Sequence, residues 1–97
     1  MYARATTAQV QPGKMDEFVS IFLDSVLPAA RQQKGYKGGL LLTNPDTGKA
    51  EIIALWETEA DMTTGEGSGY YREQVAKVAH TLAGPPAREA YKVNNRE

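Results

Sequence analysis

The stretch Tyr36–Glu57, YKGGLLLTNPDTGKAEIIALWE, contains two apolar runs separated by a short polar segment. The polar segment is NPDTG, and its Asn, Pro, Asp and Gly residues all favour turn conformations. The runs on either side are rich in Leu and Ile, and the second ends at the only Trp of the chain. The pattern predicts a β-hairpin with strands over Tyr36–Thr43 and Lys49–Glu57.

Both strands of this hairpin are apolar without alternation. Leu40–Leu42 and Ile52–Trp56 contain no charged residue, although successive residues of a strand point to opposite faces of its sheet. We therefore expect both faces of the sheet to be buried.

The residues before the hairpin predict one strand and one helix. Tyr2–Gln11 is rich in small and β-branched residues and ends at a Pro-Gly turn. A helix then begins near Lys14, and Pro28 should kink or interrupt it because proline has no N–H to donate. Gly35 should end it in the left-handed conformation. The apolar stripe of this helix consists of Met15, Phe18, Val19, Phe22 and Val26.

The residues after the hairpin predict a helical turn, a second helix and a last strand. The turn covers Thr58–Thr64 and is broken at Gly65, and the second helix begins near Ser68. Gly84–Pro86 ends that helix, and Ala87–Val93 alternates as a strand does. The apolar stripe of the second helix consists of Tyr71, Val75, Val78 and Leu82.

The element order βαββαβ predicts an α+β fold in one domain, residues 1–97 with a core over about 2–93. Short connections favour antiparallel neighbours, and the helices should pack on one face, which is the ferredoxin-like arrangement of a four-stranded antiparallel sheet. Two helices cover only one face of such a sheet. A second copy of the chain is the simplest cover for the other, so we expect a homodimer through the sheet face.

The composition disfavours several classes of partner and site. The 11 Lys and Arg residues against 12 Asp and Glu residues give no basic field for nucleic acid or an anionic membrane. The absence of cysteine excludes a disulfide framework, a thiolate metal site and a cysteine nucleophile. We also find no signal-peptide pattern and no run of about 20 apolar residues. A cytoplasmic protein is therefore expected.

The sequence resembles the antibiotic-biosynthesis-monooxygenase-like branch of the dimeric α/β-barrel superfamily over about Ala3–Val93. The resemblance rests on QPGKMDEFVSIF at the first helix, on the stretch LPAARQQKGYKGGLLLTNPDTGKAEIIALWETEADM and on AREAYKV near the C-terminus. It implies a ferredoxin-like subunit in a dimeric α/β barrel. It also implies a scaffold used for cofactor-free oxygenation of aromatic polyketides and quinols, for oxidative haem breakdown, and by members without known activity.

Four aromatic residues are candidates to line a pocket: Phe22, Trp56, Tyr70 and Tyr71. Cofactor-free oxygenation needs a pocket that binds an electron-rich aromatic, helps to remove its proton and stabilises the anion, and Tyr, Trp and Arg72 suit these tasks. The alternative is that Tyr71 belongs to the core stripe and that Trp56 fills the core, donating its indole N–H to a nearby carbonyl. The sequence identifies no catalytic residue.

His80 is the only histidine, but its position disfavours a haem site. In a regular helix it lies about 180° from the apolar stripe, so we expect it to face solvent. The haem-degrading relatives resemble one another in a first-strand Asn with Trp and His on the second helix. Here the first strand offers Thr6, Thr7 and Gln9, and Tyr70 stands where that Trp is expected.

Metal and phosphate sites are also disfavoured. Glu57, Glu59 and Asp61 have no histidine near them in the sequence, and we expect them to face water rather than to bind a metal. The segment Gly65–Gly69, GEGSG, lacks the ending of a P-loop. We expect it to form a flexible lid or a plain N-cap around Ser68.

The sequence therefore predicts a cofactor-independent, monooxygenase-like protein acting on a small aromatic or quinol compound. The alternative is a non-catalytic dimeric binding or stress-related module of unknown ligand.

Overall fold

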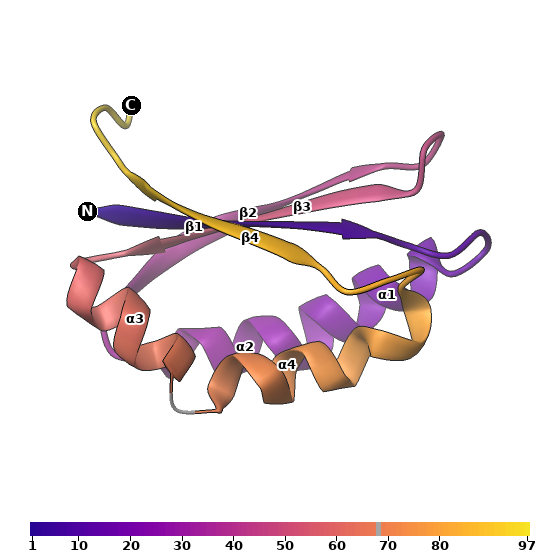
Figure 1. The fold of residues 1–97 in the computed structure, drawn as a ribbon, viewed down its shortest axis with the longest axis horizontal. Helices are drawn as coiled ribbons and strands as arrows, with labels where there is room; N and C mark the ends of the chain where they lie inside the picture. The colour runs from indigo at the N-terminus through magenta and orange to yellow at the C-terminus, as the bar shows by residue number, and fades with distance from the viewer. Residues whose placement is uncertain (68) are drawn as a thin grey trace.

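The computed structural model is a four-stranded sheet with its helices on one face (Figure 1). It describes residues 1–67 and 69–97, with the backbone alone at Glu66. The strands are β1 (Tyr2–Gln9), β2 (Tyr36–Asn44), β3 (Lys49–Trp56) and β4 (Ala87–Lys92). The helices are α1 (Met15–Ile21), the π-helix η1 (Phe22–Val26), α2 (Leu27–Arg31), α3 (Glu59–Gly67), α4 (Tyr70–Val78) and the 3₁₀-helix η2 (Ala79–Thr81).

The sheet has the strand order β2-β3-β1-β4, and every neighbouring pair is antiparallel. Tyr2 lies opposite Trp56 and Gln9 lies opposite Lys49 in the central β1–β3 pair. The hairpin predicted around NPDTG joins β2 to β3. The predicted ferredoxin-like fold is confirmed.

The first helix continues through Pro28 instead of breaking there. The backbone N–H of Leu27 donates to the carbonyl of Phe22, which closes a π turn immediately before the proline. Pro28 follows in the first turn of α2, and because proline has no N–H it leaves no donor without a partner at this change from π to α hydrogen bonding. The predicted interruption is therefore a change of hydrogen bonding, and the chain stays helical to Arg31. Gly35 has φ +83°, as predicted for the residue after this helix.

The predicted break at Gly65 is wrong, because α3 continues to Gly67. Gly65 packs on the indole of Trp56: a Cβ added at Gly65 would lie 3.0 Å from the Trp56 ring. Its lack of a side chain thus serves close packing rather than a turn. Thr58 caps the start of α3, since its Oγ1 accepts a hydrogen bond of 3.0 Å from the N–H of Asp61. The N-cap predicted around Ser68 lies outside the described residues.

The main hydrophobic core lies where the first helix and the end of α4 cover the sheet. Its buried members are Ala8, Val10, Phe18, Ala50, Val78 and Leu82. Leu82 was expected on the helical stripe, but α4 gives way to η2 after Val78, and Leu82 lies beyond both in extended backbone. It pairs there with Val10, so it reaches the core from a β-bridge.

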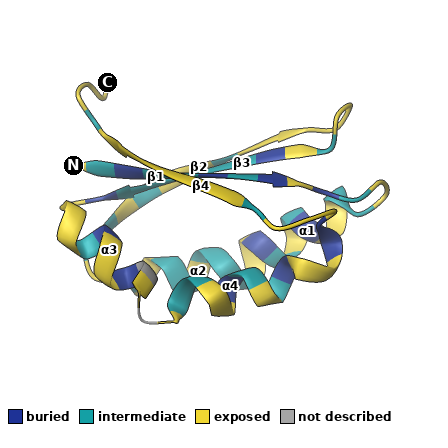
Figure 2. Cartoon of the chain, viewed as in Figure 1, coloured by how far each residue is buried: buried dark blue, intermediate teal, exposed yellow. Residues whose placement is uncertain are grey.

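None of the described helices covers the other face of the sheet, which we call the open face. Figure 2 shows β4 exposed along its length. Leu40 and Leu42 on this face are 61% and 52% exposed, and Ile53 lies directly opposite Leu40. No described helix is long and apolar enough to cross a membrane.

Candidate active site

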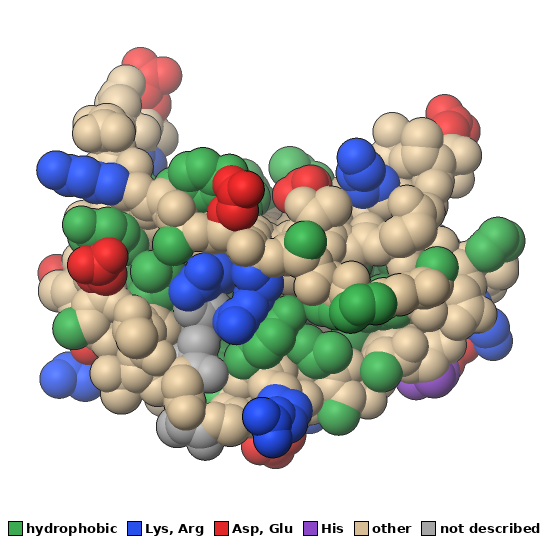
Figure 3. All heavy atoms as spheres, in the orientation of Figure 1, with side chains coloured by type: hydrophobic (Ala, Val, Ile, Leu, Met, Phe, Trp, Pro, Cys, Tyr) green, Lys and Arg blue, Asp and Glu red, His purple; other side chains and the backbone are tan. Residues whose placement is uncertain are grey.

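A cavity of about 210 Å³ lies between the sheet and the helices. Its walls come from three of the four strands, β1, β2 and β3, from the helix that runs through α1, η1 and α2, and from α4. Figure 3 shows hydrophobic side chains gathered in the band between β4 and α4, bordered by Lys and Arg side chains. The lining is mainly apolar with a few polar groups, which is the usual character of a small-molecule site.

All four aromatic candidates line this one cavity. Phe22 comes from η1 and is 8% exposed, and Trp56 from the end of β3 is 2% exposed. Tyr70 and Tyr71 come from the first turn of α4 and are half-buried. Residues up to 49 positions apart in the sequence therefore meet because the helices pack on one face of the sheet.

The indole N–H of Trp56 has no hydrogen-bond partner among the described residues, although it is buried. The prediction that it donates to a nearby carbonyl is therefore wrong. The ring is enclosed by apolar contacts instead: Tyr36 meets it edge-on with centroids 5.7 Å apart, and Gly65 packs on its six-membered ring. A buried donor without a partner costs about 1–3 kcal/mol. The prediction that Trp56 is buried is confirmed.

The arginine of the cavity is Arg4 rather than Arg72. Arg72 is exposed and does not line the cavity, whereas Arg4 does. Arg4 lies on β1 with the same orientation as Thr6 and Ala8, which also line the cavity. A second arginine, Arg88 of β4, stacks on Tyr71 with its Cζ 3.7 Å from the ring centroid, a cation–π contact.

Gln74 is a polar cavity residue that the sequence analysis missed. It lies on α4, is 7% exposed and lines the cavity. Lys77 donates a hydrogen bond of 2.9 Å from its Nζ to Oε1 of Gln74. Gln74 follows Tyr71 by three positions and so belongs to the same helical face. A search for apolar residues at helical spacing does not find it, because its side chain is polar.

Tyr36 adds a hydroxyl to the cavity wall. Burial raises the pKa of Tyr36, against a smaller opposing effect of Arg31. The hydroxyl therefore stays protonated near neutral pH and can donate a hydrogen bond.

The family model described as antibiotic biosynthesis monooxygenase matches residues 1–77. The chain belongs to this family. The matched region runs from β1 into α4 and includes the four aromatic candidates, Arg4 and Gln74. Only the last part of the cavity wall, from Val78 to Pro86, lies beyond it.

Two relatives from solved structures share the fold of this family member. The chain superposes on the monooxygenase from the gene ActVA-Orf6 of Streptomyces coelicolor, in complex with nanaomycin D, with a TM-score of 0.82, 18% identity and coverage of 99% of this chain and 89% of that one. It superposes on NE2512 of Nitrosomonas europaea, a protein of unknown function, with a TM-score of 0.79 and 21% identity. The superposition covers 99% of this chain and 91% of that one.

A curated relative is closer in sequence. Uncharacterized protein Rv2557 of Mycobacterium tuberculosis (strain ATCC 25618 / H37Rv) is 31% identical over 97 residues, which are 96% of this chain and 41% of the relative. The chain thus spans about two-fifths of the length of this relative.

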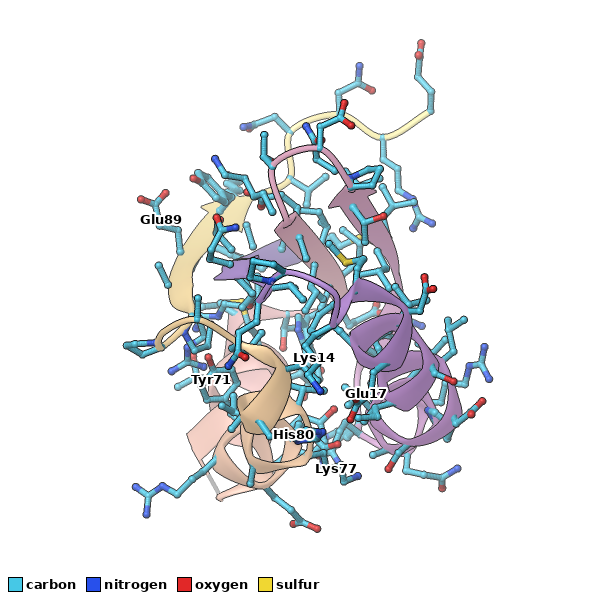
Figure 4. The ribbon with its side chains drawn as sticks, turned by 90° about the vertical axis from the view of Figure 1, so that its right-hand side faces the viewer. Lys14, Glu17, Tyr71, Lys77, His80 and Glu89 are labelled. Carbon is cyan, nitrogen blue, oxygen red and sulfur yellow. The ribbon has the colours of Figure 1, made fainter. Side chains whose placement is uncertain are left out.

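His80 of this chain lies outside the cavity. It is exposed, as predicted from its helical phase, although it lies in η2 rather than in a regular α-helix. Its Nε2 lies 2.6 Å from Oε2 of Glu17 at the start of α1, and Lys14 lies 3.6 Å from the other carboxylate oxygen (Figure 4). The hydrogen bond with His80, helped by Lys14, lowers the pKa of the Glu17 carboxyl. The pair joins α1 to η2 at the surface, away from the cavity.

The acidic residues after β3 do not form a metal site within the described part of the chain. Glu57 and Glu59 are exposed, as predicted, while Asp61 is half-buried. Lys37 forms an ion pair of 2.9 Å with Glu57, and this hydrogen bond lowers the pKa of the Glu57 carboxyl. No group of three His, Asp or Glu side chains gathers among the described residues.

Proposed function

We propose that the cavity binds a small aromatic or quinol compound and that the protein is a cofactor-independent monooxygenase. The observation that carries this proposal is the buried, unpartnered N–H of Trp56 in the wall of an apolar cavity. Nε1 has almost no accessible surface, so a ligand oxygen would supply the missing acceptor by moving the adjoining side chains aside. The ligand ring would contact Phe22, Tyr70 and Tyr71.

The lining suits the oxygenation of an electron-rich ring. Loss of a proton from a phenol or from an anthrone-type CH₂ group gives an anion, which Trp56 N–H and the other donors of the cavity would stabilise. The anion reduces molecular oxygen. One oxygen atom enters the ring as a new carbonyl group in place of two hydrogens, and the other leaves as water, so the substrate supplies all the electrons.

Family membership supports this proposal at the level of reaction class. The structural neighbour from Streptomyces coelicolor is a monooxygenase that was solved with nanaomycin D bound. The proposed extension to this chain is a compound of the same general kind, an oxygenated aromatic.

We further propose that the working unit is a homodimer through the open sheet face. Leu40 and Leu42 expose more than half of their surface on the sheet face that no helix or strand of the described residues covers. An isologous pair of such faces would bury both sets at once.

Oxygen uptake tests the enzymatic function directly. We expect purified protein to accelerate oxygen consumption with at least one member of a panel of hydroquinones and anthrones, with the product followed by quinone absorbance. Trp56→Phe keeps an aromatic ring but lacks the N–H, so we expect roughly tenfold slower turnover. His80→Ala is the matched control, and we expect it to leave turnover unchanged because His80 lies at the surface against Glu17.

The alternative function, a non-catalytic dimeric binding or stress-related module, gives a different outcome. It predicts that panel compounds bind while oxygen uptake stays at the uncatalysed rate. An equal loss of turnover in Trp56→Phe and His80→Ala would contradict the proposed site.

A further inference from the structure

Gln74 and Lys77 form a polar pair at the roof of the cavity. Gln74 is 7% exposed and lines the cavity from α4. Lys77, one turn later, donates from Nζ to Gln74 Oε1 over 2.9 Å. The same Nζ lies 3.5 Å from the carbonyl oxygen of Ser25 in η1, at the long limit of a hydrogen bond. Figure 4 shows Lys77 extending from α4 toward the first helix.

The ammonium group sets the orientation of the amide. Oε1 is an acceptor and faces Lys77, whereas the reversed amide would set its NH₂ donors against the ammonium donors. The positive charge also draws electron density toward Oε1, which strengthens the N–H groups as donors. Nε2 of Gln74 donates no hydrogen bond to another of the described residues.

Trp56 and Gln74 bring donors to the cavity from opposite layers of the fold. Trp56 ends β3 in the sheet, and Gln74 lies on α4 in the helical layer.

We propose that Lys77 positions Gln74 so that its amide N–H groups donate into the cavity, where they bind an acceptor oxygen of the ligand from the helical layer. This inference rests on the proposed function and adds a ligand-binding residue to its site. Gln74 is the residue that contacts the ligand, and Lys77 is a positioning residue.

Binding of matched probes tests the role of Gln74. The probes are 1,4-naphthoquinone, with two carbonyl oxygens, and naphthalene, with none, and binding is followed by the fluorescence of Trp56, the only Trp. We expect Gln74→Leu to weaken naphthoquinone binding about tenfold and to change naphthalene binding less than about twofold. A merely structural role would weaken both probes equally, and that outcome would overturn the proposal.

Variants of Lys77 test whether this residue positions the Gln74 amide. They also keep the proposal testable if Gln74→Leu does not fold. Lys77→Met removes the donor that orients the amide, so we expect about threefold weaker binding of naphthoquinone alone. Lys77→Arg keeps a cationic donor and should restore binding to within about twofold of the wild-type value. Unchanged naphthoquinone binding by Lys77→Met would contradict the positioning role.

The outcomes separate this inference from the proposed function. Equal binding of naphthoquinone by the wild type and by Gln74→Leu overturns the inference and leaves the proposed function standing. Wild-type protein that binds neither probe overturns both.

Discussion

Replacing Phe18 by Ala is expected to destabilise the protein by about 3–5 kcal/mol. Phe18 is 1% exposed and lies in the cluster that joins the first helix, the sheet and the end of α4. Its ring also stacks on Phe22, with centroids 6.4 Å apart. The substitution therefore removes contacts to every layer of the core and leaves a void beside the existing cavity. Urea unfolding followed by circular dichroism measures the change in the free energy of unfolding.

Leu23→Ala is the matched control for Phe18→Ala. Leu23 lies five residues later in the same helical stretch but is 50% exposed. We expect its substitution to change the free energy of unfolding by less than about 1 kcal/mol. In thermal unfolding, each kcal/mol corresponds to roughly 4–8 °C for a domain of this size. Similar losses in the two variants would show that the core does not centre on Phe18.

Leu40→Glu is expected to convert the proposed homodimer to a monomer. Leu40 is 61% exposed on the open face and lies opposite Ile53, so a carboxylate there would be buried near its symmetry mate in a face-to-face dimer. Burial of an unpaired charge costs several kcal/mol, which raises the dissociation constant about 100-fold or more. Sedimentation equilibrium at micromolar concentration should give about twice the chain mass of 10.6 kDa for the wild type and a single chain mass for Leu40→Glu.

Leu23→Glu supplies the control for the dimer. Its position is nearly as exposed as that of Leu40, but it lies on the helical side of the molecule. We expect this variant to remain dimeric. A wild-type protein that sediments as a monomer would contradict the proposed interface, as would dissociation by both Glu substitutions.

The fold could be predicted from the sequence because its strongest signals are local. The NPDTG turn, the two flanking apolar strands and the stripe ending at Val26 each specify an element within a few residues, and β2, β3 and the first helix follow them closely. Gly65 and Pro28 were harder to interpret. The close approach of Gly65 to Trp56 and the π turn that accommodates Pro28 depend on tertiary packing and backbone bonding, which residue preferences do not contain.

The candidate site could be predicted only in part. Aromatic type and position identified Phe22, Trp56, Tyr70 and Tyr71, and the structure places all four around one cavity. The unpartnered state of the Trp56 N–H could not be predicted, because it depends on which acceptors the folded chain brings near the indole.

The polar residues of the cavity were missed for a different reason. Gln74 faces the cavity because of a helical phase that the hydrophobic pattern ignores for polar residues. Arg4 faces it because alternate residues of β1 point toward the helices.

The central claim is that the Trp56 N–H donates a hydrogen bond to an oxygen of an aromatic ligand. Uniformly ¹⁵N-labelled protein has one indole N–H signal, since Trp56 is the only Trp. On titration with 1,4-naphthoquinone, we predict a saturable downfield shift of that indole proton, because hydrogen bonding deshields it, together with slower exchange with solvent. An indole signal that stays in place while surface amides shift would contradict the claim.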